Sequence, residues 1–432
     1  KSPITEQQKI PSIAVLAFDF MGQNKDQEWF GESMAGEIID DLTPIKELRV
    51  INRYSAFQFK GMRIDIRVIG DSLNVEHVLG GNIIKFENNL RVKAQLIRVS
   101  DNAQIWEDEY NIEEKDMFSV QDSISLAIVD ALKINLTKQA LAKIERPLTN
   151  NQEANELYMM GKKCMGYWVG AAKKEDFKKA LSYFQKAITL EPRFAEALEG
   201  MAWSYYWLSD SPNARKCIQK SLGIKDDLPM THLLMARLLS IDWQFTAAEE
   251  KIKKAISLNS NLAASHFVYA QFLRVMGRYD EALGEIEHAR VSDPLYIPTY
   301  AQAMAIYIDQ AEFDKAKEMF QKAEEIDPGN AYPLNHMGRL CYFTEKYEDA
   351  LKIFKERCKI LGQDTSKDVN IGIAYALWGK RDKAEEIIRA IEKDKNISDR
   401  NVFIAYIYAA LGDNEKAFEW LEKAYLNRES YL

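Results

Sequence analysis

The sequence is short of the features that mark disulfide-bonded domains and structural zinc sites. Its cysteines number four in 432 residues, and none has a close-paired spacing (Cys164, Cys217, Cys341 and Cys358). This spacing fits neither a zinc pattern nor a disulfide framework. Each cysteine falls on an expected helix, where it can serve as a small buried apolar residue. We therefore expect free thiols, which are more typical of a reducing compartment.

Long apolar runs and an excess of positive charge are also lacking. No stretch reaches the roughly 18 consecutive apolar residues that a membrane-spanning helix needs. The formal net charge is -8 and the pI is about 5.5, which disfavours a nucleic-acid-binding surface. The chain begins at Lys1 rather than at a methionine, so we expect a targeting or transmembrane segment upstream of it.

Residue patterns that carry catalysis are missing as well. There is no Walker loop, nucleophile elbow or zincin helix, and histidines number five. His232 and His266 could form a metal pair, but packing at a helix contact is the favoured interpretation because no acid or cysteine accompanies them. Arg53, Ser55 and Lys60 could hold an anion, although a solvated loop explains them equally well. We predict no catalytic residue, no metal and no cofactor, and therefore no enzyme.

A repeated helical block is what the sequence does contain. The segment 277–294 reads as a turn, an amphipathic helix and a stop at Pro294. Taking Ala282 as its marker, neighbouring markers are separated by 34 residues six times and by 33 once. The markers are Ala180, Ala214, Ala248, Ala282, Ala316, Ala350, Ala384 and Ala417. A larger apolar residue follows four positions after each one. A period of about 34 residues with two helices indicates tetratricopeptide (TPR) repeats, which form an all-α superhelical solenoid.

The segment before the repeats has a different pattern. Its alternation of apolar runs and helical spacings predicts the order β-α-β-α-β-β-β-α, a small mixed sheet with helices. The expected strands are 12–20, 48–51, 77–86, 90–99 and 104–110, and the expected helices are 29–42, 65–73 and 116–136. Leu90, Val92, Ala94 and Leu96 alternate with polar residues, so the fourth strand should have one solvated face.

This α+β segment resembles the TolB amino-terminal-like module that precedes TPR arrays in bacterial signalling proteins. The matching pieces, in order, are 12–18, 29–32, 50–55, Lys60, 78–81, 95–97, 105–106 and 118–122. Gly80 departs from the family, which more often has an acidic residue there. The module has no agreed enzymatic activity. The resemblance implies a membrane-anchored protein whose other side carries a winged-helix DNA-binding head or a class III nucleotide cyclase.

These patterns predict four parts: a tether at 1–10, the α+β domain at 11–140, a linker at 141–152 and eight TPR repeats at 153–432. The first repeat has an enlarged segment at 166–176, which could rest on the α+β domain or extend into solvent. Charged residues near the end of the chain, including Glu419 and Glu429, could keep the last repeat soluble.

In the TPR family the first helix of each repeat lines a concave groove, and its inner-wall positions carry over by register. We predict a partner-binding groove rich in aromatic and arginine side chains, a composition typical of interaction hot spots. Its residues are Trp203, Tyr206, Trp207, Leu233, Arg237, Phe267, Gln271, Arg274, Tyr332, Asn335, Arg339, Tyr342 and Phe343. Arginine and asparagine there could bind a peptide carboxylate. Equally, the aromatics could fill the groove or pack between repeats.

The sequence thus predicts a non-enzymatic module that binds a peptide or protein, with no direct nucleic-acid or membrane contact of its own. The alternative is the regulatory part of a nucleotide cyclase or transcriptional regulator, and a structural part of an envelope assembly is a third possibility. The family context indicates the extracytoplasmic, periplasmic side of a single-span protein, whereas the free cysteines indicate the cytoplasm. Ligand identity and oligomeric state do not follow from the sequence.

Overall fold

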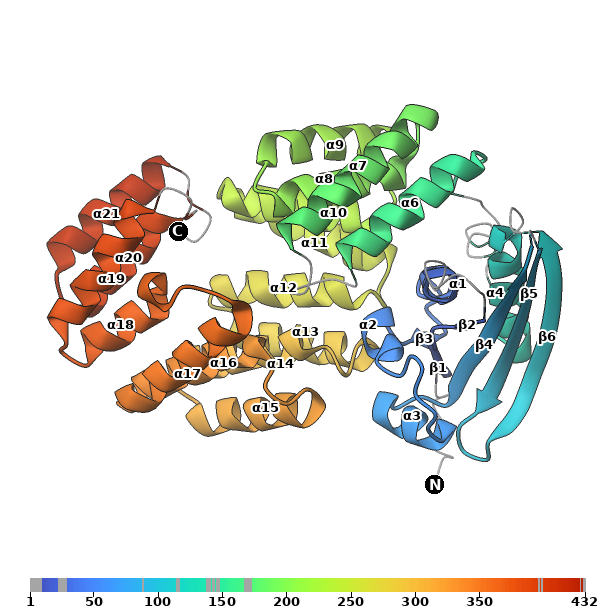
Figure 1. The fold of residues 1–432 in the computed structure, drawn as a ribbon, viewed down its shortest axis with the longest axis horizontal. Helices are drawn as coiled ribbons and strands as arrows, with labels where there is room; N and C mark the ends of the chain where they lie inside the picture. Colours follow the sequence, from blue (N-terminus) through green and yellow to red (C-terminus); the bar gives the residue numbers. More distant parts are fainter. Residues whose placement is uncertain are drawn as a thin grey trace, which may run out of the picture. The chain divides into compact units, whose positions relative to one another are not determined.

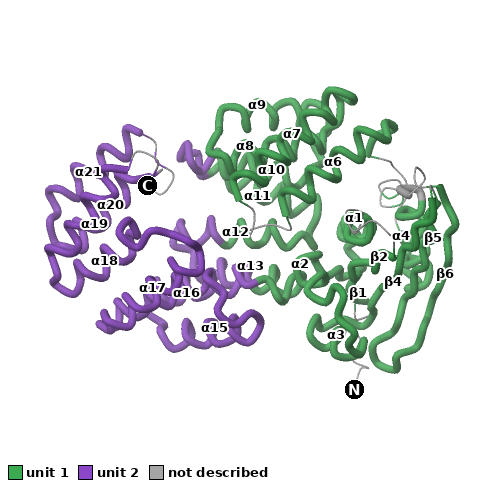
Figure 2. The backbone as a smooth tube through the Cα atoms, in the orientation of Figure 1, with its two compact units in different colours: residues 1–238, 246–270, 287–296 green, residues 239–245, 271–286, 297–432 purple. Residues whose placement is uncertain are grey.

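The computed structural model describes residues 10–21, 29–87, 89–113, 117–136, 141, 144, 148–166, 173–394, 397, 399–427 and 429. The predicted tether, up to residue 9, and most of the enlarged segment at 166–176 lie outside these residues. Contacts divide the chain into two compact units (Figure 2). Unit 1 comprises 1–238, 246–270 and 287–296, and unit 2 comprises 239–245, 271–286 and 297–432.

Unit 1 contains the predicted small mixed sheet (Figure 1). Its strand order is β3-β1-β4-β5-β6, from β1 (Ser12–Val15), β3 (Arg49–Val50), β4 (His77–Phe86), β5 (Asn89–Arg98) and β6 (Ala103–Glu113). β1 is parallel to β3 and β4, whereas β4, β5 and β6 form an antiparallel meander. Helices α1 (Trp29–Leu42), α3 (Ile66–Leu73) and α4 (Met117–Ala131) lie on the two faces.

The sheet follows from alternation along the strands. Ile13 and Val15 pack into the core on the side of α1 and α4, while Ala14 packs on the side of α3. On β5, Leu90, Val92, Ala94 and Leu96 are fully buried, as the alternation predicts. The intervening side chains of β5 are polar, and Lys93 Nζ lies 2.5 Å from Glu107 Oε1 of β6.

The structure corrects two details of this segment. The expected strand at 12–20 is two strands, because the backbone leaves β1 after Val15 and pairs again with β4 as β2 (Asp19–Met21). Between them Phe18 turns into the core and its N–H donates to the carbonyl of Gly31, 3.2 Å away. A short helix α2 (Arg53–Phe57) was not predicted, since five residues are too few to show a helical period.

The rest of the described chain consists of helix pairs. Their bounds are α6 (Gln152–Met165), α7 (Lys174–Leu190), α8 (Ala195–Trp207), α9 (Ser211–Ile224), α10 (Pro229–Ile241), α11 (Phe245–Leu258), α12 (Ala263–Val275), α13 (Tyr279–Ser292), α14 (Ile297–Asp309), α15 (Phe313–Ile326), α16 (Ala331–Phe343), α17 (Tyr347–Leu361), α18 (Val369–Leu377), α19 (Arg381–Lys393), α20 (Arg400–Ala410) and α21 (Asn414–Leu426). A short 3₁₀ turn, η3 (Thr365–Lys367), precedes α18. This is the predicted small mixed sheet followed by a helical solenoid.

The predicted register coincides with the packing. Each of the eight marker alanines lies on the second helix of a pair and is at most 5% exposed. Two of the phenylalanines four positions after a marker, Phe184 and Phe354, face a glycine on a neighbouring first helix. A Cβ built on Gly338 would lie 2.4 Å from the ring of Phe354, and one on Gly200 would lie 2.5 Å from that of Phe184. The helices approach closely at these glycines.

The last repeat is held by a carboxylate that was expected only to provide solubility. Asp399 precedes α20 without making a side-chain cap. Instead Glu429 accepts hydrogen bonds from the Asn401 side chain and, at 2.9 Å, from the N–H of Val402. Its negative charge satisfies free N–H groups at the start of α20.

None of the described helices combines the length and apolarity that crossing a bilayer requires. Cys164, Cys217, Cys341 and Cys358 are free thiols, as predicted, and Cys164 is the one that is partly exposed.

Candidate functional site

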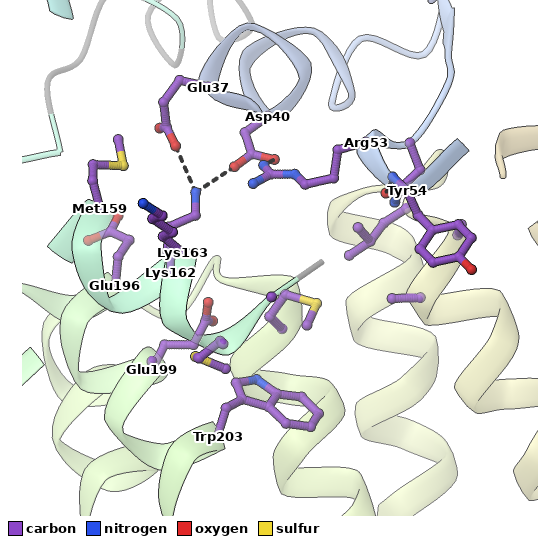
Figure 3. A pocket seen from close by; sticks show the side chains of 18 of the residues that line it. Glu37, Asp40, Arg53, Tyr54, Met159, Lys162, Lys163, Glu196, Glu199 and Trp203 are labelled. Atoms are coloured by element: carbon purple, nitrogen blue, oxygen red, sulfur yellow. Dashed lines mark hydrogen bonds and ion pairs between the residues drawn. The ribbon is translucent and has the colours of Figure 1, made fainter. Parts of the chain in front are cut away.

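Unit 1 contains a cavity of about 240 Å³, called here the unit 1 cavity. Four first helices of the repeats (α6, α8, α10 and α12) line it together with α1 and the start of α2 (Figure 3). The aromatic residues Tyr158, Trp203 and Phe267 come from these helices, and Tyr296 comes from the loop after α13. Acidic and basic side chains of both the α+β segment and the repeats also line the cavity. The α+β segment therefore faces the inner wall of the first repeats.

An ion network joins α1 to α6 along one edge of this cavity. Lys162 Nζ lies 2.7 Å from Glu37 Oε1 and 2.9 Å from Asp40 Oδ2 (Figure 3). Asp40 also pairs with Arg53. Burial by itself would raise the pKa of Asp40, but Arg53 and Lys162 outweigh it and lower that pKa to about 2. Burial would likewise lower the pKa of Lys162, yet Asp40 and Glu37 raise it.

A second set of contacts ties the α+β segment to the loops after α11 and α13. The side-chain amide of Asn261 donates to the carbonyls of Thr43, Ile45 and Leu48, at 3.1, 2.9 and 3.0 Å. Asp293 accepts from both the N–H and the hydroxyl of Ser55. These bonds satisfy backbone carbonyls and a buried carboxylate at the contact, so the contact is specific.

Asp293 is the most perturbed acid of this contact. Its side chain is 4% exposed, and burial raises the pKa of its carboxyl to about 7 although the two bonds from Ser55 act to lower it. Next to it, the rings of Tyr54 and Tyr296 meet edge to face with centroids 5.1 Å apart. α2, which sequence reasoning missed, thus helps to hold the α+β segment at the end of α13, together with Arg49, which donates to the carbonyl of Val291 at 3.0 Å.

Glu199 lies on the α8 wall of the cavity, one turn before Trp203 (Figure 3). Its Oε2 accepts a hydrogen bond from the Thr231 hydroxyl at 2.6 Å. Burial raises the pKa of Glu199 to about 7; the Thr231 bond lowers it and the charge of Glu196 raises it further. At neutral pH this carboxyl is close to half protonated.

The structure separates the predicted groove residues of unit 1 into three groups. Trp203, Arg237 and Phe267 line the unit 1 cavity. Tyr206 and Trp207 pack edge to face at 5.3 Å, and Trp207 stacks on Phe177 at 5.9 Å, which is the packing between helices weighed as the alternative. Leu233 is fully buried. It belongs to the core, so the expectation that it lines an open groove is not met.

In unit 2 the predicted arginines meet a carboxylate that sequence reasoning overlooked. Arg274 Nε lies 2.7 Å from Asp309 Oδ2, and Arg339 Nη2 lies 3.5 Å from Asp309 Oδ1. Arg274, Asp309 and Arg339 come from α12, α14 and α16, the first helices of successive pairs. Two guanidinium groups therefore share one resident carboxylate, which leaves donors of both in excess.

The neighbouring predicted residues of unit 2 vary in accessibility. Phe343 is 50% exposed and Tyr332 is 38% exposed, whereas Tyr342 is buried. Asn335 Oδ1 accepts from Asn370 Nδ2 at 3.0 Å, so its amide is engaged between helices. Gln271 is half-buried on α12. Binding by any of these residues stays a prediction.

His336 lies among the cationic side chains of unit 2. Burial, followed by the charges of Arg339, Arg274 and Arg357, lowers the pKa of His336 to about 3. The imidazole is therefore neutral at physiological pH and adds no positive charge to this surface.

The two alternative ligand sites weighed from the sequence are both engaged in internal contacts. His232 Nε2 lies 2.7 Å from the carbonyl oxygen of Asp226, and His266 Nε2 lies 2.9 Å from that of Ser260, the packing role favoured above. Among the described residues no cluster suited to a metal ion is found. Lys60 pairs with Glu32 at 2.6 Å, and Arg53 and Ser55 bond to Asp40 and Asp293. None of the three is a free anion ligand.

Most of the cavity was not predicted because its walls come from distant parts of the chain. Glu37 and Lys162, which both line it, are 125 residues apart, and Asp293 of the wall bonds to Ser55, which lies 238 residues earlier. One signal was present: Asn52, Arg53 and Tyr54 belong to the TolB-like pieces, and all three line the cavity.

Comparison with known proteins agrees with the helical pairs. A family model described as Tetratricopeptide repeat matches residues 171–194, 302–330 and 399–430. "Putative adenylate cyclase 3" of Rhizobium meliloti (strain 1021) is 39% identical over 127 residues, which cover 29% of this chain and 22% of that protein. Superkiller complex protein 3 of Mus musculus is 22% identical over 258 residues, which cover 57% of this chain and 16% of that protein. The chain thus corresponds to less than a quarter of either relative.

Among solved structures, the APC/C hetero-tetramer Cut9–Hcn1 is similar with a TM-score of 0.48 and 15% identity, over 72% of this chain and 60% of that one. The phase of the marker alanines, the helix pairs built around them and the family match lead to one conclusion. The C-terminal part of this chain is an array of tetratricopeptide repeats.

Proposed function

We propose that this chain is a non-enzymatic interaction and sensing module of a bacterial signalling protein, which binds an acidic peptide or protein segment on the inner wall of unit 2. The observation that supports this most is the convergence of Arg274 and Arg339 on Asp309. Asp309 occupies the place that a ligand carboxylate would take, and the exposed ring of Phe343 supplies an apolar contact on the same helix as Arg339.

The physical basis is charge complementarity. Two arginines and one aspartate carry a net positive charge, and guanidinium groups bind carboxylates with paired, charge-assisted hydrogen bonds. A half-exposed aromatic side chain beside them is typical of an interaction hot spot. Because the pairs are only partly buried, we expect micromolar rather than tighter binding, with a strong dependence on salt.

The test is binding of a fluorescein-labelled decapeptide of alternating glutamate and leucine, measured by anisotropy, with its lysine counterpart as the control peptide. The double variant R274A/R339A should weaken binding at least tenfold, since it removes both cations. The matched control R381A/R389A removes two exposed arginines of α19 that pair with Glu385 and should leave affinity unchanged. D309N should strengthen binding a few-fold by removing the competing carboxylate. Equal affinity of both double variants for the acidic peptide would contradict the proposal.

A second candidate is the regulatory region of a nucleotide cyclase. The specific support is the 39% identity with the adenylate cyclase relative named above. Cyclase activity in the longer protein that changes when R274A/R339A is introduced would favour it; an activity indifferent to the acidic peptide and to these variants would argue against it.

For the remaining predictions we propose a TolB-like identity for the α+β segment and a periplasmic location on a single-span protein. The arrangement of a small α+β domain ahead of a TPR array supports the former. A C-terminal alkaline phosphatase fusion on the longer protein would be active outside the cytoplasm, and an inactive fusion would contradict that location.

A further inference from the structure

Besides Asp293, which accepts two hydrogen bonds from Ser55, the unit 1 cavity contains one carboxylate whose contacts differ from those of its neighbours. Glu37 and Asp40 pair with Lys162, Glu196 pairs with Lys225, and Glu32 pairs with Lys60. Glu199 instead accepts its hydrogen bond from a hydroxyl, that of Thr231. In the part of the chain that the structure describes, Glu199 makes no ion pair. An ionised carboxylate in a largely enclosed site is costly unless a cation accompanies it.

Aromatic side chains line the same cavity as this carboxylate. Trp203 lies four residues after Glu199 on α8 and therefore shares its face of the helix (Figure 3). Tyr158 of α6 and Phe267 of α12 line the same cavity. A carboxylate beside aromatic faces is the arrangement that attracts organic cations, because the ring quadrupole adds to the ionic attraction.

We propose that the unit 1 cavity binds a primary ammonium group, with Glu199 as its counter-ion and Trp203 as the aromatic wall. The group could be carried by a small organic amine or by a lysine side chain. An anionic ligand fits less well, since Lys162 and Arg53 are already paired with Glu37 and Asp40. Lys163 also lines the cavity, but Figure 3 places it beside Lys162 on α6 and not on the α8 wall that carries Glu199.

The size of the cavity limits the ligand. A volume of about 240 Å³ lies just below the range of drug-sized pockets and suits a molecule of roughly ten heavy atoms. Phenethylammonium, with one ring and one ammonium group, is a small probe that uses both features. Nα-acetyl-lysine amide carries the same ammonium on a peptide-like stem.

Binding should be linked to a proton. Burial raises the pKa of Glu199 to about 7, and the groups that bear on it are Glu196 of α8, Thr231 of α10 and Lys162 of α6. Tyr158 of α6 and Arg237 of α10 also line the cavity. An ammonium ligand favours the ionised form and so lowers this pKa. Affinity should then rise about tenfold from pH 6 to pH 8, and binding near pH 7 should release a fraction of a proton.

The experiment is isothermal titration of the whole chain with phenethylammonium, Nα-acetyl-lysine amide and the anion hydrocinnamate, in two buffers of different ionisation enthalpy. We expect the first two to bind with proton release and the anion not to bind. Stronger binding of phenethylammonium indicates a free amine as the ligand, and stronger binding of the lysine amide indicates a protein side chain.

Three variants complete the test, with circular dichroism to verify folding. E199Q keeps the shape and removes the charge, so both amines should bind at least tenfold more weakly. E153Q, an exposed glutamate of α6, is the matched control and should bind as the wild type does. T231V removes the hydroxyl bond and should move the pH midpoint of binding upward, which gives a readout if E199Q does not fold. Binding of hydrocinnamate, or amine binding that is insensitive to both E199Q and pH, would overturn the proposal.

Discussion

At the scale of single residues, the repeats depend on glycines that face large aromatic rings. Gly338 on α16 has no side chain where the ring of Phe354 on α17 comes within 2.4 Å of an added Cβ. Phe354 is fully buried, so the ring has no room to move. The repeat register identifies Phe354 as a core position, but it does not identify the residue on the facing helix that must lack a side chain.

This contact predicts opposite outcomes for two chemically identical substitutions. G338A should destabilise the protein by about 1–2 kcal/mol, since overpacking outweighs the helix propensity that alanine gains. G284A on α13 should stabilise it by up to about 1 kcal/mol, because an added Cβ there meets nothing within 4 Å. Urea denaturation measures both.

The double variant G338A/F354L provides the control. A smaller side chain opposite the new methyl group should recover most of the lost stability, as expected for residues in contact. If G338A and G284A changed stability alike, backbone propensity rather than the ring contact would govern both positions.

At the scale of elements, α2 and the loop after α13 meet through one titrating carboxyl. The pKa of Asp293 is raised by burial to about 7, above the value near 3.9 of an unfolded chain. The protonated form is therefore favoured in the folded state. The stability that this protonation contributes is fully present below the unfolded pKa and is lost as the pH rises through about 7.

The D293N variant should isolate this effect, because an amide keeps an acceptor for Ser55 and does not ionise. Relative to D293N, the wild type should lose up to about 1.4 kcal/mol of stability for each pH unit between about 4 and 7, and the difference should level off above pH 7, where the carboxyl is ionised in both states. Chemical denaturation of both proteins between pH 5 and 8.5 measures it. A constant difference over that range would show that Asp293 is ionised throughout.

Elements long enough to show a period were predictable, and short ones were not. The marker alanines placed every second helix of the repeats, and alternation placed the buried face of β5. The five residues of α2 show no period, and the strand at 12–20 divides because Phe18 turns inward. The repeat register alone could not show what the predicted groove residues contact. Arg274 and Arg339 were found by position, but their shared partner Asp309 becomes evident only when three helices are placed together.

At the scale of the whole molecule, the two units have separate surfaces with different chemistry. The unit 1 cavity combines α1 and α2 with the first helices of the repeats, so the α+β segment contributes to the wall of the site. The inner wall of unit 2 carries the arginines and Phe343. A sensing module with two ligands would need these surfaces to respond either independently or together.

Matched glycine variants test whether the two surfaces respond independently or together. G200A presses on Phe184 in unit 1, and G338A presses on Phe354 in unit 2. In a repeat array each repeat contacts mainly the repeats next to it, so the effect of a substitution should stay local. Hydrogen exchange should rise in α6, α7 and α8 for G200A and in α16 and α17 for G338A. The double variant should show the sum of both changes, within about 0.5 kcal/mol in stability. Faster exchange in α16 caused by G200A would contradict independence, and would instead indicate that a ligand in the unit 1 cavity can alter the peptide surface of unit 2.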